Sequence, residues 1–299
     1  MHIKNTKQRK KQAVKNKALF GPGGNSDSFY EAGFKSSLDA PVFVKNFGLD
    51  AYEYEAGNGV SASADTFKKL GEAAKREDIK LSIHAPYYIS LSSVDPEKRM
   101  GSSKYILSSA IALDAMGGDI MVIHAGSTAK LDRSVALDYA KEALFHALKV
   151  LSDNELYGYK LGIETMGKVN QLGTLDEVLE MCKVDSTVVP VVDFGHMNAR
   201  DGGSVFTSTD DYKRVFDKIA SSCGAFAAEE LHCHFSKIEY TKGGEKRHLT
   251  FDDNIYGPDF EPLMKAICDL GVHPTIICES AGTQAKDALL MKNEYLKLL

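Results

Sequence analysis

Short apolar segments rich in β-branched residues alternate along the chain with longer segments in which apolar residues recur at helical spacing. From residue 18 onward, each short segment ends in polar or glycine-rich sequence, and this alternation is typical of repeated βα units. Eight short segments are predicted as strands: ALF (18–20), LDAYEY (49–54), IKLSIH (79–84), DIMVIH (119–124), KLGIE (160–164), VVPVVD (188–193), ELHCHF (230–235) and PTIICE (274–279).

The segments between these strands carry helix signals. Residues 97–116 and 133–151 have the spacing of helices. The sequence TLDE at 174–177 has the form of a capping box, in which a threonine and a glutamate satisfy free backbone N–H groups at a helix start. The segment TQAKDALLMKNEYLKLL at 283–299 is predicted as the last of eight helices.

Strands such as VVPVV and TIIC are almost continuously apolar, which indicates burial on both faces, as in a parallel sheet covered by helices. Eight βα units are the number that closes into a (β/α)8 barrel. We therefore predict an α/β fold in which residues 18–299 form a single TIM barrel that is the catalytic domain. In such barrels chemistry gathers at the carboxyl ends of the strands.

Composition excludes several classes of protein. No stretch approaches the roughly 20 apolar residues that span a bilayer, and the N-terminus lacks the apolar segment of a secretory signal. The five cysteines are odd in number and form no C-x-x-C pair, which argues against a disulfide framework or a thiolate zinc site. These features favour a cytoplasmic protein with buried thiols and no membrane partner.

Charge is unevenly distributed along the chain. The formal net charge is −5, but residues 1–17 carry seven Lys/Arg and no acid, which leaves about −12 for the remainder. We predict that residues 1–17 form a basic, disordered arm. A tether to nucleic acid phosphates is the alternative for this arm.

Six consecutive predicted strands end in a possible metal ligand. Any one of these histidines or carboxylates has an ordinary structural explanation. Gathered at one barrel mouth, however, they would repel one another or be buried unpaired unless a cation held them. The residues are His84, His124, Glu164, Asp193 with His196 three positions later, His232 and His234, and Glu279.

The blocks around these residues resemble a known family. In order, SIHAPYYISL, VIHAGS, GIETMGKVNQLG, VVDFGHMNAR, the histidines of 232–248 and IICES are similar to the metal-binding blocks of endonuclease IV, an apurinic/apyrimidinic endonuclease built on the xylose-isomerase-like TIM barrel. The resemblance covers roughly residues 79–285. It implies two or three metal ions, usually zinc with manganese as a further candidate, and cleavage of damaged double-stranded DNA on the 5′ side of an abasic nucleotide.

The resemblance also implies roles for single residues. His84 and His124 would hold one metal, with Glu164 as a bridge to the next. Asp193, Glu279 and a histidine of the seventh strand would hold a second metal, and His196 and His248 a third. We predict Glu164 and Glu279 as the catalytic residues, since either carboxylate could orient the attacking water.

The seventh strand offers two histidines for one role. His232 and His234 point to the same side of a strand, and His234 lies nearer the carboxyl end where the metals are expected. We therefore expect His234 to be the ligand and His232 to lie one layer deeper.

Recognition of DNA is suggested by two aromatic residues. Tyr87 and Tyr88 follow His84 at the positions where the family inserts side chains into the duplex, and aromatic rings there can stack on bases. Lining of any polar pocket is the other interpretation. Against DNA, residues 46–67 contain no Lys or Arg, although the family usually places basic residues there to grip phosphates.

The last block departs from the family, because Lys246 stands where the family carries a metal-binding aspartate two residues before the histidine. Two arrangements are open. The loop could twist to deliver Glu245 beside His196 and His248, or Lys246 itself could supply positive charge to the substrate and leave the third metal weak or absent. We expect the second arrangement, because a regular strand turns Glu245 to the opposite side.

A metal-dependent sugar isomerase or epimerase on the same barrel is the rival function. Such enzymes need one ion, held by a quartet corresponding to Glu164, Asp193, His234 and Glu279. They move a proton beside a carbonyl with two glutamates. They have no need of His84, His124 and His248 as ligands, so the larger set favours the endonuclease.

Overall fold

The computed structural model of the chain describes residues 17–299. The predicted basic arm therefore lies outside the described residues, apart from Lys17.

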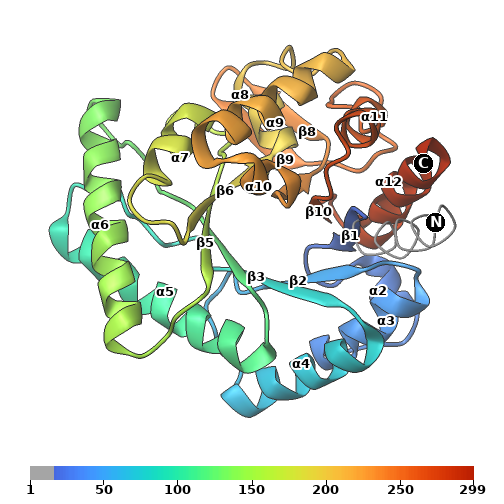
Figure 1. The fold of residues 1–299 in the computed structure, drawn as a ribbon, viewed down its shortest axis with the longest axis horizontal. Helices are drawn as coiled ribbons and strands as arrows, with labels where there is room; N and C mark the ends of the chain where they lie inside the picture. Colours follow the sequence, from blue (N-terminus) through green and yellow to red (C-terminus); the bar gives the residue numbers. More distant parts are fainter. Residues whose placement is uncertain (1–16) are drawn as a thin grey trace, which may run out of the picture.

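Eight parallel strands form the barrel that was predicted (Figure 1). Their order is β1-β10-β7-β6-β5-β4-β3-β2, and backbone bonds from Asp50 N to Phe20 O (2.8 Å) and from Gly24 N to Glu53 O (2.9 Å) join the two ends of this order. The strands are β1 (Leu19–Pro22), β2 (Ala51–Glu55), β3 (Lys80–His84), β4 (Ile120–Ile123), β5 (Lys160–Glu164), β6 (Val188–Asp193), β7 (His232–Phe235) and β10 (Thr275–Cys278).

Helices surround this barrel on the outside (Figure 1). The predicted capping box is confirmed, because the Thr174 side chain and Glu177 satisfy each other's backbone N–H groups at the start of α7. The helices are α2 (Asp27–Glu31), α3 (Ala40–Asn46), α4 (Ala64–Glu77), α5 (Pro96–Met116), α6 (Arg133–Asp153), α7 (Leu175–Met181), α8 (Phe194–Arg200), α9 (Thr209–Cys223), α10 (Ala225–Glu229), α11 (Glu261–Leu270) and α12 (Gln284–Leu298), with a 3-10 turn at Ser37–Asp39.

Short helices are added to the βα pattern that the sequence predicted. One of them, α8, starts directly at the end of β6, where the Asp193 side chain caps it by accepting a hydrogen bond from His196 N. This cap fixes the spacing between a strand-end carboxylate and a histidine one turn later.

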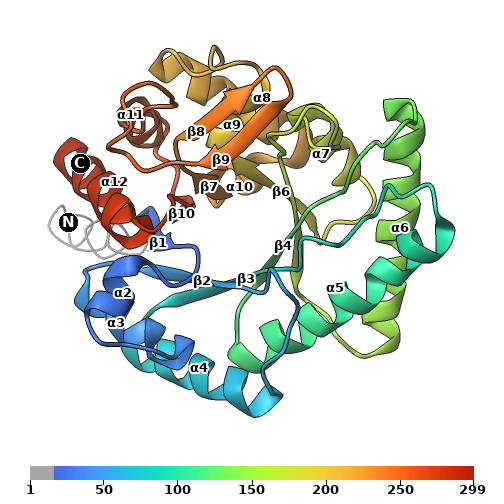
Figure 2. The same ribbon diagram turned by 180° about the vertical axis from the view of Figure 1, so that it is seen from behind.

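A two-stranded antiparallel hairpin follows β7 and is not part of the barrel wall. It consists of β8 (Ile238–Thr241) and β9 (Gly244–His248), and Figure 2 shows it beside α8 on the side of the molecule that faces the viewer there. Its turn pairs with the loop after β5 through Val169 N to Gly243 O (3.0 Å) and Glu245 N to Gly167 O (3.0 Å). The hairpin therefore covers part of the barrel mouth.

The apolar core lies mainly between the strands and the helices. A separate small cluster of Ile120, Val122 and Val191 belongs to inward positions of β4 and β6, because alternate residues of a barrel strand face the interior. Glu53 and His232 are also buried, so part of the barrel interior is polar.

The cysteines and the helices agree in part with the compositional predictions. All five cysteines are free thiols, of which Cys182, Cys233 and Cys278 are buried and two are partly exposed. In the part of the chain that is described, no helix has both the length and the apolar character needed to cross a membrane.

Candidate metal centre

One mouth of the barrel gathers the residues predicted as metal ligands. They form overlapping groups of imidazoles and carboxylates in which one ligand atom of each residue lies within 4.8 Å of the others. These groups include all eight predicted ligands: His84, His124, Glu164, Asp193, His196, His234, His248 and Glu279.

Glu164, at the end of β5, lies between the first two histidines. Atoms that share a tetrahedral zinc ion are about 3.3 Å apart, since each lies about 2.0–2.1 Å from the ion, whereas hydrogen-bonded N and O atoms are about 2.9 Å apart. His84 Nε2 lies 3.3 Å from Glu164 Oε2, and His124 Nε2 lies 2.8 Å from the same atom. The first separation suits two ligands of one ion, and the second is that of a hydrogen bond.

A second group surrounds the other oxygen of Glu164. His234 Nδ1 lies 3.2 Å from Glu164 Oε1 and 3.4 Å from Glu279 Oε1, and Asp193 completes the group. His232 instead contacts Glu53, with His232 Nε2 2.8 Å from Glu53 Oε2. The structure therefore brings His234 to the other predicted ligands and places His232 deeper in the barrel.

The third group contains Glu245, which we had expected to face away from His196 and His248. Glu245 Oε2 lies 3.5 Å from His196 Nε2, and His196, Glu245 and His248 together form a possible ligand set. The expectation that Lys246 occupies this corner is wrong.

A β-bulge explains why Glu245 replaces Lys246. Glu239 pairs with Arg247 but its neighbour Tyr240 pairs with Glu245, so the register shifts and Lys246 is the extra residue. An extra residue interrupts the alternation of side chains, which puts Glu245 on the same side as His248. Lys246 and Arg247 both form ion pairs with Glu239.

Gly167 makes room for the third group. A Cβ atom at this position would lie 2.6 Å from Glu245 Cβ and 3.0 Å from His196 Cδ2, both closer than ordinary contacts. The backbone bond from Glu245 N to Gly167 O holds the two segments in this close approach. The loop after β5 thus needs a residue without a side chain at this point.

Three of the predicted ligand histidines have one ring nitrogen held by a neighbouring group. His84 Nδ1 lies 2.9 Å from Ala85 O, His196 Nδ1 lies 3.0 Å from Thr165 O, and His248 Nδ1 lies 2.8 Å from Ser236 Oγ. In each ring Nε2 is left for the cavity side. Metal-binding histidines are usually oriented in this way through their second nitrogen.

The two glutamates that were predicted as catalytic have opposite electrostatic environments. Burial alone would raise the pKa of Glu164, but the imidazoles that face it, His124 and His234 first, hold this pKa well below its usual range. Burial raises the pKa of Glu279 well above its usual range; His234 opposes this, and the nearby carboxylates of Glu164 and Asp193 add to it. A dication between the carboxylates would relieve this repulsion.

The donor atoms present fit a cluster of divalent metal ions. Asp193 Oδ2 and His196 Nε2 are buried and have no hydrogen-bond partner among residues 17–299, although leaving a buried polar atom unpaired is costly. Imidazole and carboxylate donors are those that zinc and manganese bind.

A cavity of about 400 Å³ opens over these groups. Tyr87 lines it and is 64% exposed, whereas Tyr88 packs its ring against Tyr105. Lys168, from the loop after β5, is the lysine among the described lining residues.

Two carboxylates near the centre were missed by sequence reasoning. Glu53 and Glu55 lie on β2, where Glu53 contacts His232 and Glu55 lines the cavity. A signal was present, because Glu53 lies inside a predicted barrel strand (49–54), where a carboxylate that faces the interior is buried and needs a partner.

Comparison with known proteins agrees with this geometry. An uncharacterized protein of Methanocaldococcus jannaschii is 34% identical over 83% of this chain and 88% of its own length, and a probable endonuclease 4 of Acholeplasma laidlawii is 29% identical over 73% and 78%. The solved structure of a D-tagatose 3-epimerase-like protein has the same fold, with a TM-score of 0.67, 19% identity and coverage of 94% and 97%.

Residues 42–295 match the family described as Xylose isomerase-like TIM barrel. Together with the ligand groups at the barrel mouth, this match fixes the broad class of the protein. The chain belongs to the xylose isomerase-like TIM barrel family and is one of its metal-binding enzymes.

Proposed function

We propose that the protein is a metal-dependent phosphodiesterase that cleaves DNA on the 5′ side of abasic sites. The observation that carries this proposal is the third ligand group, His196, Glu245 and His248. An enzyme that uses one ion needs only the group around Glu164 and Glu279, so a further complete set favours chemistry that uses several ions. The similarity to a probable endonuclease 4 supports the same class.

The metal ions would supply Lewis acidity toward the oxygens of the phosphodiester. The protein contributes the geometry of the centre. Glu164 presents one oxygen to His84 and His124 and the other to His234, so it links two ligand groups. Glu279 lies at the cavity, where its carboxylate orients the attacking water and accepts its proton.

Tyr87 and Lys168 are the side chains we propose for substrate contact. Tyr87 is exposed at the cavity and can stack on a base or fill the gap left by a missing one. Tyr88 supports it, with ring centroids 5.3 Å apart. Lys168 takes the role of phosphate contact that the sequence had suggested for Lys246.

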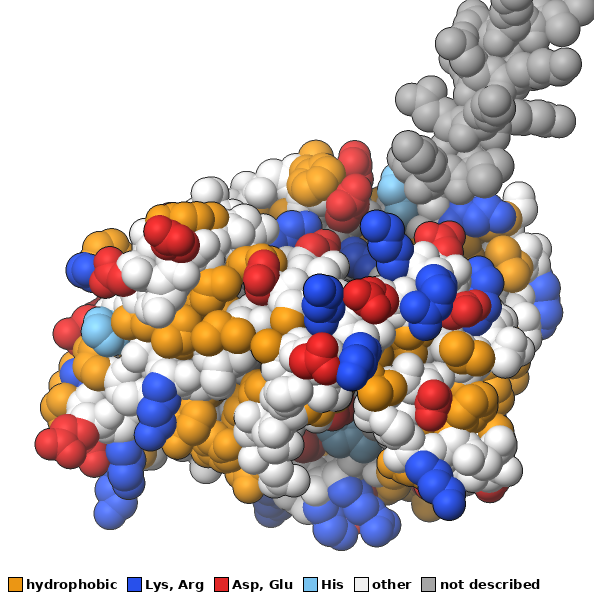
Figure 3. All heavy atoms as spheres, turned by 90° about the horizontal axis from the view of Figure 1, so that it is seen from below, with side chains coloured by type: hydrophobic (Ala, Val, Ile, Leu, Met, Phe, Trp, Pro, Cys, Tyr) orange, Lys and Arg blue, Asp and Glu red, His pale blue; other side chains and the backbone are white. Residues whose placement is uncertain are grey.

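The lack of basic residues near β2 limits the number of phosphate contacts that the protein can make with a duplex. Residues 46–67 contain no Lys or Arg. Figure 3, which views the molecule from one side, shows acidic and basic side chains interspersed over the face seen there. Phosphate contacts make a large contribution to affinity for DNA. We therefore expect weaker and strongly salt-dependent DNA binding, centred on the hairpin and the loop after β5.

A sugar epimerase is the second candidate. The quartet of Glu164, Asp193, His234 and Glu279 is complete, and it is sufficient for proton transfer beside a carbonyl at one ion. The fold of a D-tagatose 3-epimerase-like protein is similar over nearly the whole chain, although at 19% identity this likeness concerns the fold alone.

One experiment separates the two functions. The zinc- or manganese-loaded protein is incubated with a duplex that contains a single tetrahydrofuran abasic analogue, and with an intact duplex as control. We expect a nick 5′ to the analogue only, and none with Glu164→Gln. An intact abasic duplex together with epimerisation of a ketohexose by the same preparation would refute the proposal.

A further inference from the structure

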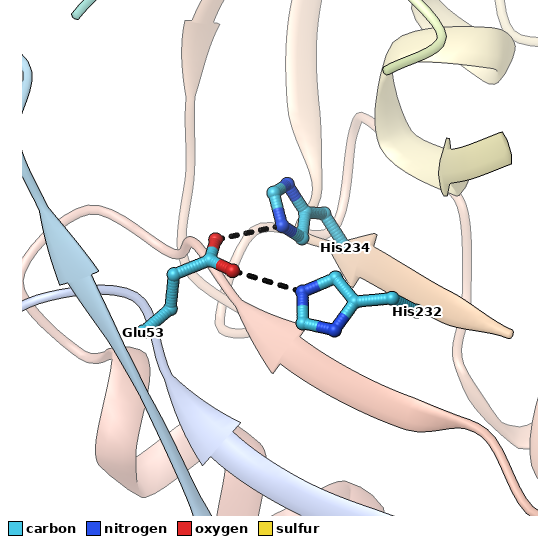
Figure 4. Close-up of side chains that lie close together, drawn as sticks. All are labelled: Glu53, His232 and His234. Carbon is cyan, nitrogen blue, oxygen red and sulfur yellow. Dashed lines mark hydrogen bonds and ion pairs between the residues drawn. The ribbon is translucent and has the colours of Figure 1, made fainter. Parts of the chain in front are cut away.

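A buried cluster of polar side chains lies beneath the ligand groups, inside the barrel. Glu53 of β2 stands between His232 and His234 of β7, with one carboxylate oxygen toward each ring (Figure 4). Ser82 of β3 donates a hydrogen bond of 2.7 Å to Glu53 Oε2. None of these four side chains belongs to a residue that is more than 4% exposed.

The distances in this cluster are those of hydrogen bonds, although Glu53, His232 and His234 also lie close enough together to hold an ion. Glu53 lies 2.8 Å from His232 Nε2 and 2.8 Å from His234 Nε2, whereas two ligands of a tetrahedral zinc ion are about 3.3 Å apart. Glu53 does not line the cavity over the ligand groups. The cluster therefore lies beneath the ligand groups, on the side away from the cavity.

The two nitrogens of His234 face different surroundings. Nδ1 lies among the ligand carboxylates, 3.2 Å from Glu164 Oε1 and 3.4 Å from Glu279 Oε1. Nε2 and Glu53 Oε1 have no other hydrogen-bond partner in the described chain, and 2.8 Å separates them. Each of these two buried atoms can therefore serve as the hydrogen-bond partner of the other.

Glu53 stands in the same relation to His234 as the backbone carbonyls do to His84 and His196. Those carbonyls hold Nδ1 and leave Nε2 to the cavity side. For His234 the arrangement is reversed, and the holding group is a carboxylate. A carboxylate fixes the ring orientation and increases the basicity of the opposite nitrogen more than a carbonyl does.

We propose that Glu53 is a positioning residue that commits His234 to bind metal through Nδ1, and that His232 and Ser82 hold Glu53 in place. The proposal rests on the metal centre of the proposed function and is independent of the substrate. His232 thereby gains a role as the group that fixes the second oxygen of Glu53.

Metal titration of the full chain tests the proposal without any assay of activity. The metal-free protein is titrated with zinc by calorimetry, and Glu53→Gln is compared with the wild type. We expect one equivalent to bind roughly 10–100-fold more weakly, with the number of equivalents at saturation unchanged. Ser82→Ala, which removes one hydrogen bond to Glu53, should show a smaller loss for the same equivalent.

Tyr52→Phe is the matched control. It removes one hydrogen bond of β2, from Tyr52 Oη to Asn25 Oδ1 (2.9 Å), next to Glu53 in sequence but directed away from the centre. Its zinc affinity should equal that of the wild type. Equal affinity of Glu53→Gln and wild type would overturn the proposal, as would the loss of one whole equivalent at saturation, because the cluster would then be a metal site itself.

Nitrogen NMR of the imidazole rings gives a second readout on the wild-type protein, so the test does not depend on the folding of a variant. The signals of His234 are assigned by their loss in His234→Asn. On addition of zinc we expect the resonance of Nδ1 to shift as a ligand and Nε2 to remain protonated. Coordination through Nε2 would contradict the proposal, even if abasic DNA is cleaved.

Discussion

The carboxylate of Glu177 connects the loop after β5 to helices α6 and α7. Its removal should make the free energy of unfolding less dependent on pH. Arg133 contacts both oxygens of Glu177 at 2.7 Å, and Glu177 also accepts hydrogen bonds from Gly173 N and Thr174 N. Arg133 donates further bonds to Val169 O and Gln171 O. This network holds the loop that carries Gly167 and Lys168 at the metal centre.

The size of the effect follows from the pKa of Glu177. Burial opposes ionisation, but the hydrogen bonds from Arg133 and the two backbone N–H groups outweigh it and lower the pKa from 4.5 to about 2. At about 1.4 kcal/mol per unit, the ionised carboxylate stabilises the fold by at most about 3.5 kcal/mol. Because the Arg133 side chain is 38% exposed, solvent screening reduces this to about 2 kcal/mol.

The direction of the pKa shift sets the pH range in which the Glu177 carboxylate stabilises the fold. A depressed pKa in the folded state gives stability that is fully present above the unfolded value of 4.5 and is lost as the pH falls toward about 2. Glu177→Gln lacks this contribution. The difference in the free energy of unfolding between wild type and variant should therefore be largest near pH 6 and shrink by more than 1 kcal/mol by pH 3.

Urea unfolding at several pH values, followed by circular dichroism, measures this difference. Glu180→Gln is the control, because Glu180 lies on the same helix, its side chain is 44% exposed, and among the described residues its ion pair is with Lys183. Its effect should be small at every pH. A difference for Glu177→Gln that stays constant from pH 6 to pH 3 would refute the reasoning, since it would show that the carboxylate is not preferentially ionised in the folded state.

Four further predictions concern the metal centre and its substrate. The purified protein should carry at least two equivalents of zinc or manganese by elemental analysis, and Glu164→Gln should lose metal and turnover while circular dichroism remains that of the folded barrel; a variant that keeps more than about a tenth of the wild-type rate would show that Glu164 is no bridge. Gly167→Ala should displace Glu245 and weaken only the ion of the third group, so unchanged metal stoichiometry and affinity would count against that group. Tyr87→Ala should weaken binding of abasic duplex by about 1–3 kcal/mol in a titration, whereas Tyr88→Phe should leave it unchanged; equal binding by Tyr87→Ala and wild type would remove the aromatic contact from the proposal.

Much of the fold was available from the sequence, because the signals are local. The strands at 160–164 and 188–193 were predicted with the bounds that the structure has, and the other six strands shift only at their ends. A strand that is buried on both faces has a continuous apolar sequence, which can be recognised without knowing its neighbours. The capping box at Thr174 is likewise complete within four residues.

The strand-end ligands could also be predicted from local sequence, because a parallel barrel brings the carboxyl ends of all its strands to one mouth whatever the detailed packing. Position along the strand was enough to select His234 over His232, because both side chains point to the same side and His234 lies nearer the carboxyl end. Sequence position alone therefore identified the eight predicted ligands that gather there.

Features that depend on contacts between distant segments were set only by the tertiary structure. The bulge at Lys246 brings Glu245 to His196, and it is stabilised by pairing of the hairpin with the loop after β5. The partner of His234, Glu53, is far away in sequence. Neither contact leaves a periodic signal, because the register between two strands and the partner of an inward-facing carboxylate are set only when the barrel closes.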